Sequence, residues 1–121
     1  MSDDPLRARL RRALLAAMKG RDPVAIAALR SGLAAIDNAE AVAPPPAPMP
    51  RAGIVAAGMV GLGAGEAERR QLSEDQMADI IRTEIADRQA AAEEYERAGH
   101  LDQSARLTAE ADVLAAHLTR S

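Results

Sequence analysis

Residues 73–99, SEDQMADIIRTEIADRQAAAEEYERAG, decide the fold class of this chain. Ser73 with Gln76 three residues later is a capping box, which predicts the start of a helix. Apolar residues then recur at the three- and four-residue spacing of one helical face. They are Met77, Ile80, Ile81, Ile85, Ala91, Ala92, Tyr95 and Ala98. Gly99 is the residue type that commonly ends a helix, so the stretch predicts about seven helical turns.

The residues that follow predict another helix, packed back against this one. It begins near Asp102, a short turn after Gly99, and it carries an apolar stripe. That stripe consists of Leu107, Ala111, Leu114 and Leu118. A turn this short brings two helices into an antiparallel hairpin. Residues 66–119 are therefore expected to form a C-terminal helical hairpin.

The N-terminal part of the chain repeats this plan. Asp4–Pro5 and Asp22–Pro23 each place an N-cap residue before a proline suited to the first helical position. The first of these helices is expected to end at Lys19–Gly20, and the second near Glu40. Their apolar stripes are Leu6, Leu10, Ala13, Leu14 and Ala17, and then Ile26, Leu29, Leu33 and Ile36. Residues 4–41 thus predict an N-terminal helical hairpin.

Residues 42–65 separate the two hairpins and differ from them in composition. Five of the seven prolines and five of the eight glycines lie there, which indicates a flexible linker rich in Pro, Ala and Gly. The string GLGAG at 61–65 faintly resembles a dinucleotide-binding loop, but no strand is expected before it. We expect an all-α fold in which the two hairpins form one small four-helix bundle.

Composition narrows the class of protein further. The 121 residues include no cysteine and one aromatic residue, Tyr95, so disulfide scaffolds, thiolate metal sites and β-sandwiches are excluded. No apolar run reaches the roughly 18 residues that span a bilayer, and the charged N-terminus lacks the apolar core of a signal peptide. We therefore expect a cytoplasmic protein. Because Leu, Ile and Val total only 23 residues, a homodimer or another partner is expected to add stability.

Residues suited to catalysis or metal binding are sparse. No serine–histidine arrangement offers a nucleophile, and the Glu-x-x-His pairs of di-iron bundles are absent. His100 and His117 fall in a turn and near the end of the last helix, and neither is expected to hold a ligand. The sequence predicts no metal, no cofactor and no catalytic residue, which favours a protein other than an enzyme.

Positive charge gathers in the first 30 residues, which hold seven basic and three acidic residues in a chain of net charge −3. On the first helix, Arg9, Arg12 and Lys19 fall within about 80° of one another, opposite the apolar stripe. Such a ridge suits the phosphates of RNA. The other interpretation is an ordinary solvated helix face.

Three further charged residues stand out because they interrupt apolar faces. Glu84 and Arg88 lie four residues apart in the middle of the apolar face of the 73–98 helix. Glu110 borders the stripe of the last helix and could reach Arg88 across the hairpin. A buried charge needs a partner. The three predict either an ion-pair network that fixes helix register or a polar binding groove for a partner.

Two stretches of this sequence resemble the GatB/YqeY domain family. They are LSEDQMADIIRTEIADRQAAAEEYERAGHLDQSARLTAEADVLAAHL, residues 72–118, and LRSGLAAIDNAEA, residues 29–41. The first stretch is similar through Glu84, Arg88, Tyr95, Gly99, Glu110, Leu114 and Leu118. The second is similar through Arg30, Asn38 and Glu40.

The resemblance implies an all-helical fold and kinship with the tail of the B subunit of the tRNA-dependent amidotransferase. That enzyme amidates mischarged Glu-tRNA or Asp-tRNA with glutamine as amide donor, and the family's carbon–nitrogen ligase label derives from it. No residue here is assigned that chemistry. Typical members continue into a further small helical domain, so we expect this chain to hold the first domain only.

Two hypotheses about function follow. The first is a non-catalytic accessory protein of tRNA-dependent amidation or translation, which binds RNA, tRNA above all, or an amidotransferase-like protein. The alternative is a helical protein–protein interaction or dimerisation module with no role in RNA binding. Salt-dependent RNA binding separates the first hypothesis from the second.

Overall fold

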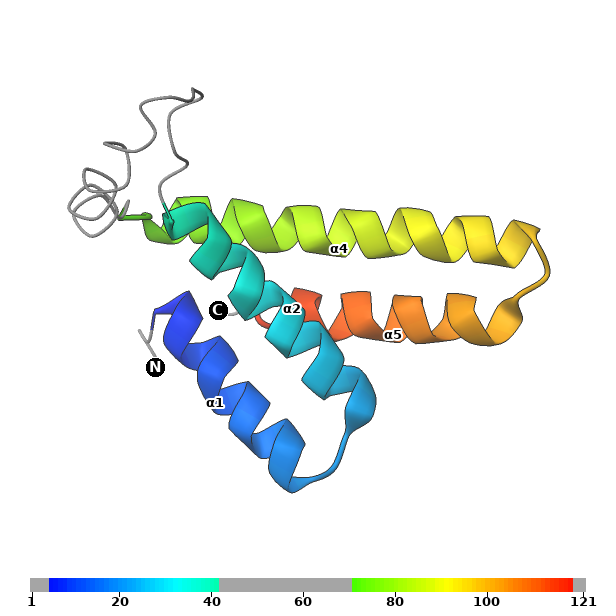
Figure 1. Ribbon diagram of the computed structural model, residues 1–121, viewed down its shortest axis with the longest axis horizontal. Helices are drawn as coiled ribbons and strands as arrows, with labels where there is room; N and C mark the ends of the chain where they lie inside the picture. The colour runs from blue at the N-terminus through cyan, green and yellow to red at the C-terminus, as the bar shows by residue number, and fades with distance from the viewer. Residues whose placement is uncertain (1–4, 42–70, 119–121) are drawn as a thin grey trace, which may run out of the picture.

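The computed structural model describes residues 5–41 and 71–118, and within these ranges it consists of four helices and no strand (Figure 1). The helices are α1 (Leu6–Lys19), α2 (Pro23–Glu40), α4 (Glu74–Arg97) and α5 (Leu101–Ala116). The all-α fold predicted from the sequence is confirmed. The predicted linker, with its GLGAG string, lies outside the described residues.

The two hairpins pack against each other over only part of their length. The α1–α2 hairpin lies across one half of the α4–α5 hairpin, and the other half projects beyond it (Figure 1). We call this projecting part, which ends in the turn between α4 and α5, the arm. The largest fully buried side chains come from all four helices and form one core: Leu10, Leu29, Ile36, Ile81 and Leu114.

A glycine marks the point where α2 comes closest to the second hairpin. Gly32 is buried, and a Cβ atom built on it would lie 3.0 Å from Ile81 Cδ1 and 3.2 Å from Leu114 Cδ2. The buried face of α2 is centred on small residues, and it comprises Ala25, Ala28, Leu29, Gly32 and Ile36. The expected stripe residues Ile26 and Leu33 are only partly buried, because close packing selects the small side chains.

Two of the predicted helix starts are confirmed by their capping bonds. Asp22 Oδ1 accepts a hydrogen bond from the Ala25 N–H at 3.1 Å. Ser73 and Gln76 form the predicted capping box, since the Gln76 N–H donates to Ser73 Oγ at 3.0 Å and the Ser73 N–H donates to Gln76 Oε1 at 2.8 Å. Local side chains therefore satisfy the first backbone donors of α2 and α4.

The start of α1 differs from the prediction. Pro5 occupies the N-cap with an extended ψ of 152°, so it is not the first helical residue. The Leu6 N–H donates instead to Glu74 Oε1, 2.8 Å away at the beginning of α4. A carboxylate near a helix N-terminus is favourable because the exposed N–H groups carry partial positive charge. A distant residue thus does the capping that was expected of the local sequence.

Both hairpin turns use the same helix ending, but with different residues in the left-handed position. After α4, Gly99 adopts φ 86°, and the His100 N–H donates to the Tyr95 carbonyl at 2.8 Å. After α1, Arg21 adopts φ 56°, and the following N–H reaches the Ala17 carbonyl at 3.0 Å. These are Schellman motifs, in which glycine is the usual left-handed residue. Gly20 was expected to end α1 in this way, yet it has φ −84°.

The left-handed Arg21 leads to a first testable prediction. Replacing Arg21 with Gly is expected to raise the free energy of unfolding by about 0.5–1 kcal/mol, because glycine has no Cβ to strain in this conformation. Gly99→Arg makes the opposite change in the same motif and is expected to lower stability. Urea unfolding followed by circular dichroism measures both. A destabilised Arg21→Gly variant would mean that the Arg21 side chain contributes more to the fold than its backbone strain costs.

Candidate functional site

Charge divides between the two hairpins. Residues 5–41 carry seven basic and three acidic side chains, whereas residues 71–118 carry four basic and eleven acidic ones. The α1–α2 hairpin is therefore positive and the α4–α5 hairpin negative. Such a separation directs anionic partners to one end of the molecule and cationic partners to the other.

The three residues of the predicted basic ridge differ in their exposure to solvent. Arg9 is partly buried, and its Nη2 donates to the His117 carbonyl at 2.8 Å. His117 is the C-cap of α5, where a cation offsets the negative end of the helix dipole. Arg9 thus holds α1 to the end of α5. Arg12 and Lys19 are exposed.

The structure brings Glu84, Arg88 and Glu110 together, as the sequence predicted. Arg88 Nη1 donates to Glu84 Oε1 at 2.9 Å, and Arg88 Nε donates to Glu110 Oε1 at 3.0 Å. The Arg88 side chain is 14% exposed and that of Glu110 is 10% exposed. Charge-assisted bonds of this length in a largely buried setting are strong, and each carboxylate compensates part of the buried positive charge.

Ser31 is a further member of this group that the sequence analysis missed. Its Oγ donates to Glu84 Oε1 at 2.9 Å, so the group ties α2 to α4 and α5. We call these four residues, Ser31, Glu84, Arg88 and Glu110, the polar cluster. The signal for Ser31 was its place beside Gly32, where the backbone of α2 approaches closely. Because the members bond one another, the arrangement favours a structural role over a binding groove.

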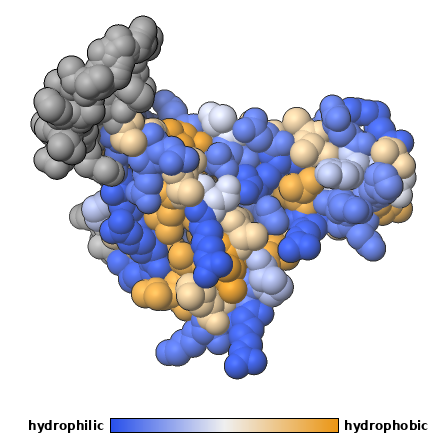
Figure 2. Space-filling model, viewed as in Figure 1, coloured by the Kyte–Doolittle hydropathy of each residue, from blue (hydrophilic) through white to orange (hydrophobic). Residues whose placement is uncertain are grey.

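A basic hollow lies where the α1–α2 hairpin turns. Its lining consists of Met18, Arg21, Pro23, Ile26 and Arg30. We call this surface the basic hollow. Figure 2 shows apolar residues gathered between α1 and α2 on the face in view, and hydrophilic side chains at the end of the α1–α2 hairpin. Sequence analysis missed this site because its lining comes from two helices and from the left-handed Arg21.

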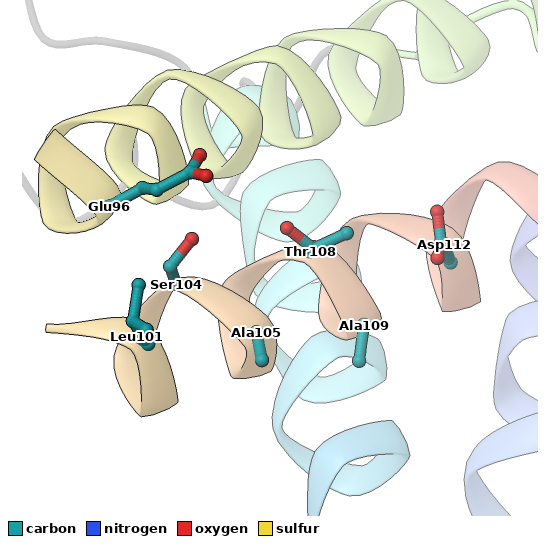
Figure 3. Close-up of a pocket in the computed structure, with 7 residues that line it drawn as sticks. All are labelled: Glu96, Leu101, Ser104, Ala105, Thr108, Ala109 and Asp112. Atoms are coloured by element: carbon teal, nitrogen blue, oxygen red, sulfur yellow. The ribbon is translucent and has the colours of Figure 1, made fainter. Parts of the chain in front are cut away.

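A second hollow lies on the arm, between α4 and α5 (Figure 3). Its lining consists of Glu96, Leu101, Ser104, Ala105, Thr108, Ala109 and Asp112. We call this hollow the arm groove. Its floor consists of small side chains of α5, with a carboxylate from each helix. No histidine lies among the lining residues, so the Ser104 and Thr108 hydroxyls have no imidazole beside them to act as a general base.

Tyr95 lies on the arm but outside the core in which it was predicted. Its side chain is 40% exposed, and its ring meets the His100 ring edge-on, with centroids 6.0 Å apart. The prediction was wrong because α1 and α2 do not extend over the arm (Figure 1). Ala92 is buried as well, but it does not belong to the core cluster of the four helices.

The structure of residues 5–41 and 71–118 also bears on metal binding and membrane insertion. No group of three or more side chains that could hold a metal ion occurs in these two ranges. None of the helices described there is long and apolar enough to cross a membrane.

Comparison with known proteins finds no match to this chain among protein-family models, curated proteins or solved structures. The resemblance to the GatB/YqeY family therefore stays a prediction that rests on the sequence stretches quoted above.

Proposed function

We propose that this chain is a non-catalytic, cytoplasmic RNA-binding protein of the GatB/YqeY kind, accessory to tRNA-dependent amidation or translation. Its binding surface is the exposed side of α1 that carries Arg12 and Lys19. The observation that carries the proposal is the concentration of positive charge on the α1–α2 hairpin in a chain of net charge −3. The sequence resemblance to the relatives of the tRNA-dependent amidotransferase supports tRNA as the first RNA to test.

The geometry of α1 suits contact with a phosphate backbone. Arg12 and Lys19 are seven residues apart, which places them on the same side of α1 and about 10 Å apart along its axis. Both are exposed, and each can approach a phosphate while the apolar side of α1 stays in the core. The negative α4–α5 hairpin repels RNA and so favours an approach from the α1 side.

The test is equilibrium binding of bulk tRNA across a series of salt concentrations. Wild type is expected to bind with micromolar affinity at about 50 mM salt. Replacing both Arg12 and Lys19 with Gln is expected to weaken binding and to reduce the log–log salt slope by about 1.4–1.8, because each phosphate contact contributes about 0.7–0.9. Arg9 is left intact, since it holds α1 to α5.

The matched control changes two exposed arginines of α4, Arg82 and Arg97, to Gln. It removes the same amount of charge from the other hairpin and is expected to keep the wild-type slope. If both double variants lose affinity equally, net charge rather than the α1 surface governs binding. No binding at about 50 mM salt would refute the RNA proposal.

The second candidate function is a protein–protein interaction module with no RNA role. The arm favours it, because it projects from the core with Leu101 62% exposed. An amidotransferase-like protein or a second copy of this chain are the partners that the sequence suggested. A chain that binds no tRNA but gains stability with a partner would support this second function.

A further inference from the structure

We propose that this chain associates with a second copy of itself, with the arm groove of one copy seated on the basic hollow of the other. The argument rests on the chemistry of these two surfaces and is independent of RNA binding. Both surfaces lie outside the core shared by the four helices. Figure 1 shows the α1–α2 turn and the arm as separate projections of one copy.

The lining of the basic hollow combines apolar side chains with two cations. Met18 is 43% exposed, and Pro23 and Ile26 line the hollow beside it. Arg21 and Arg30 are exposed. Within residues 5–41 and 71–118, no ion pair or side-chain hydrogen bond joins either guanidinium to another residue. Two cations beside apolar side chains suit an acidic surface that also carries an apolar side chain.

The backbone of Arg21 is a second observation that points to this hollow. A left-handed conformation costs an ordinary residue roughly 1–2 kcal/mol relative to its usual conformations, and glycine avoids that cost. The equivalent position after α4 is a glycine, Gly99. The chain therefore places a guanidinium beside the hollow at a position where glycine is the more stable choice. Strain of this kind is common at binding sites.

The arm groove has the complementary chemistry. Glu96 and Asp112 supply negative charge, and neither makes an ion pair within the described part of the chain. Ala105 and Ala109 also line the groove (Figure 3), and their small side chains leave room for a large apolar one. Leu101, 62% exposed at the end of the arm, is available to fill a hollow in return.

A second copy is the occupant that this complementarity selects. Carboxylates meet guanidinium groups, small side chains meet the larger Met18 and Ile26, and Leu101 meets the apolar lining of the hollow. Contact of two different surfaces is heterologous. Such an interface contains exposed charges, so it is expected to be reversible and to weaken with salt.

Analytical ultracentrifugation of the full chain tests this inference. Wild type is expected to associate at micromolar concentrations in about 50 mM salt, and at least about tenfold more weakly in 500 mM salt. Arg21→Glu with Arg30→Glu reverses the charge of the basic hollow. Glu96→Arg with Asp112→Arg reverses that of the arm groove. Each double variant alone is expected to associate at least about tenfold more weakly than wild type.

An equal mixture of the two double variants gives the decisive result. In the mixture, the intact groove of one variant can meet the intact hollow of the other, and the reversed groove can meet the reversed hollow. Association is therefore expected to return. Wild type that stays monomeric at every concentration, or a mixture that stays monomeric, would overturn the proposal. Far-UV circular dichroism and melting temperatures verify that each variant is folded.

Two further variants separate this surface from net charge and from the turn. Arg12→Glu with Lys19→Glu makes the same charge change on α1, at residues that do not line the basic hollow, and is expected to preserve association. An equal loss in this control would overturn the proposal. Arg21→Gly is expected to raise the melting temperature by about 2–8 °C and yet to weaken association at least about threefold. Unchanged association in Arg21→Gly would overturn the role of its guanidinium in the interface.

Discussion

Replacing Arg88 with Ala is expected to lower the free energy of unfolding by about 3 kcal/mol. The change removes the cation that Glu84 and Glu110 share, at 2.9 Å and 3.0 Å. Two carboxylates then remain close together in a largely buried place without their common partner. Most of the loss comes from these stranded charges rather than from the bonds themselves, because the cost of removing charged groups from water offsets much of the attraction within a buried ion pair.

The matched control is on the same helix. Arg82 also pairs with a carboxylate, Asp79 Oδ1 at 2.6 Å, but its side chain is 61% exposed. Arg82→Ala is therefore expected to cost less than about 0.5 kcal/mol, as exposed ion pairs do. Urea unfolding of both variants gives the comparison. A loss below about 1 kcal/mol for Arg88→Ala would show that water reaches the polar cluster.

A second large loss is expected when Gly32 is replaced with Val. The Cβ position already lies 3.0 Å from Ile81 Cδ1 and 3.2 Å from Leu114 Cδ2, so a branched side chain forces α2 away from the core. Overpacking of this kind costs about 1–3 kcal/mol. We expect a loss near 3 kcal/mol, because valine adds two methyl groups beyond the Cβ, and its gain in helix propensity over glycine is smaller than that of alanine.

Gly32→Ala is the control for this prediction. Alanine adds only the Cβ, and its helix propensity exceeds that of glycine by about 1 kcal/mol. That gain offsets the tight contacts with the Ile81 and Leu114 side chains, so the net change is expected to stay within about 1 kcal/mol. Thermal or urea unfolding measures both variants. Equal stability of the Val and Ala variants would show that α2 can shift without loss of packing.

Local signals carried most of the fold prediction. The starts of α2 and α4 follow from Asp22 and from the Ser73–Gln76 box, whose bonds the structure contains. Apolar spacing found Leu10 and Leu29, which lie in the core. Signals of this kind act within a few residues of the chain, so a single sequence suffices to recognise them.

Features that depend on distant residues were the ones that sequence analysis missed. Arg9 sits on a polar face of α1, and only the position of α5 brings the His117 carbonyl to it. Ser31 joins the polar cluster because Gly32 lets α2 approach α4 and α5. Tyr95 follows the helical spacing of the core but lies beyond the reach of α1 and α2. The spacing of apolar residues predicts which face of a helix is buried, but it does not show how far the neighbouring helices extend along that face.

The bond between Leu6 and Glu74 links the two hairpins in another way. The first residue of α1 obtains its acceptor from a residue 68 positions further along the chain. The first turn of α1 is therefore completed only when α4 has arrived beside it, and it loses that acceptor when the hairpins separate. The bond therefore couples the stability of the first turn of α1 to docking of the second hairpin, although α1 belongs to a hairpin that its own sequence defines.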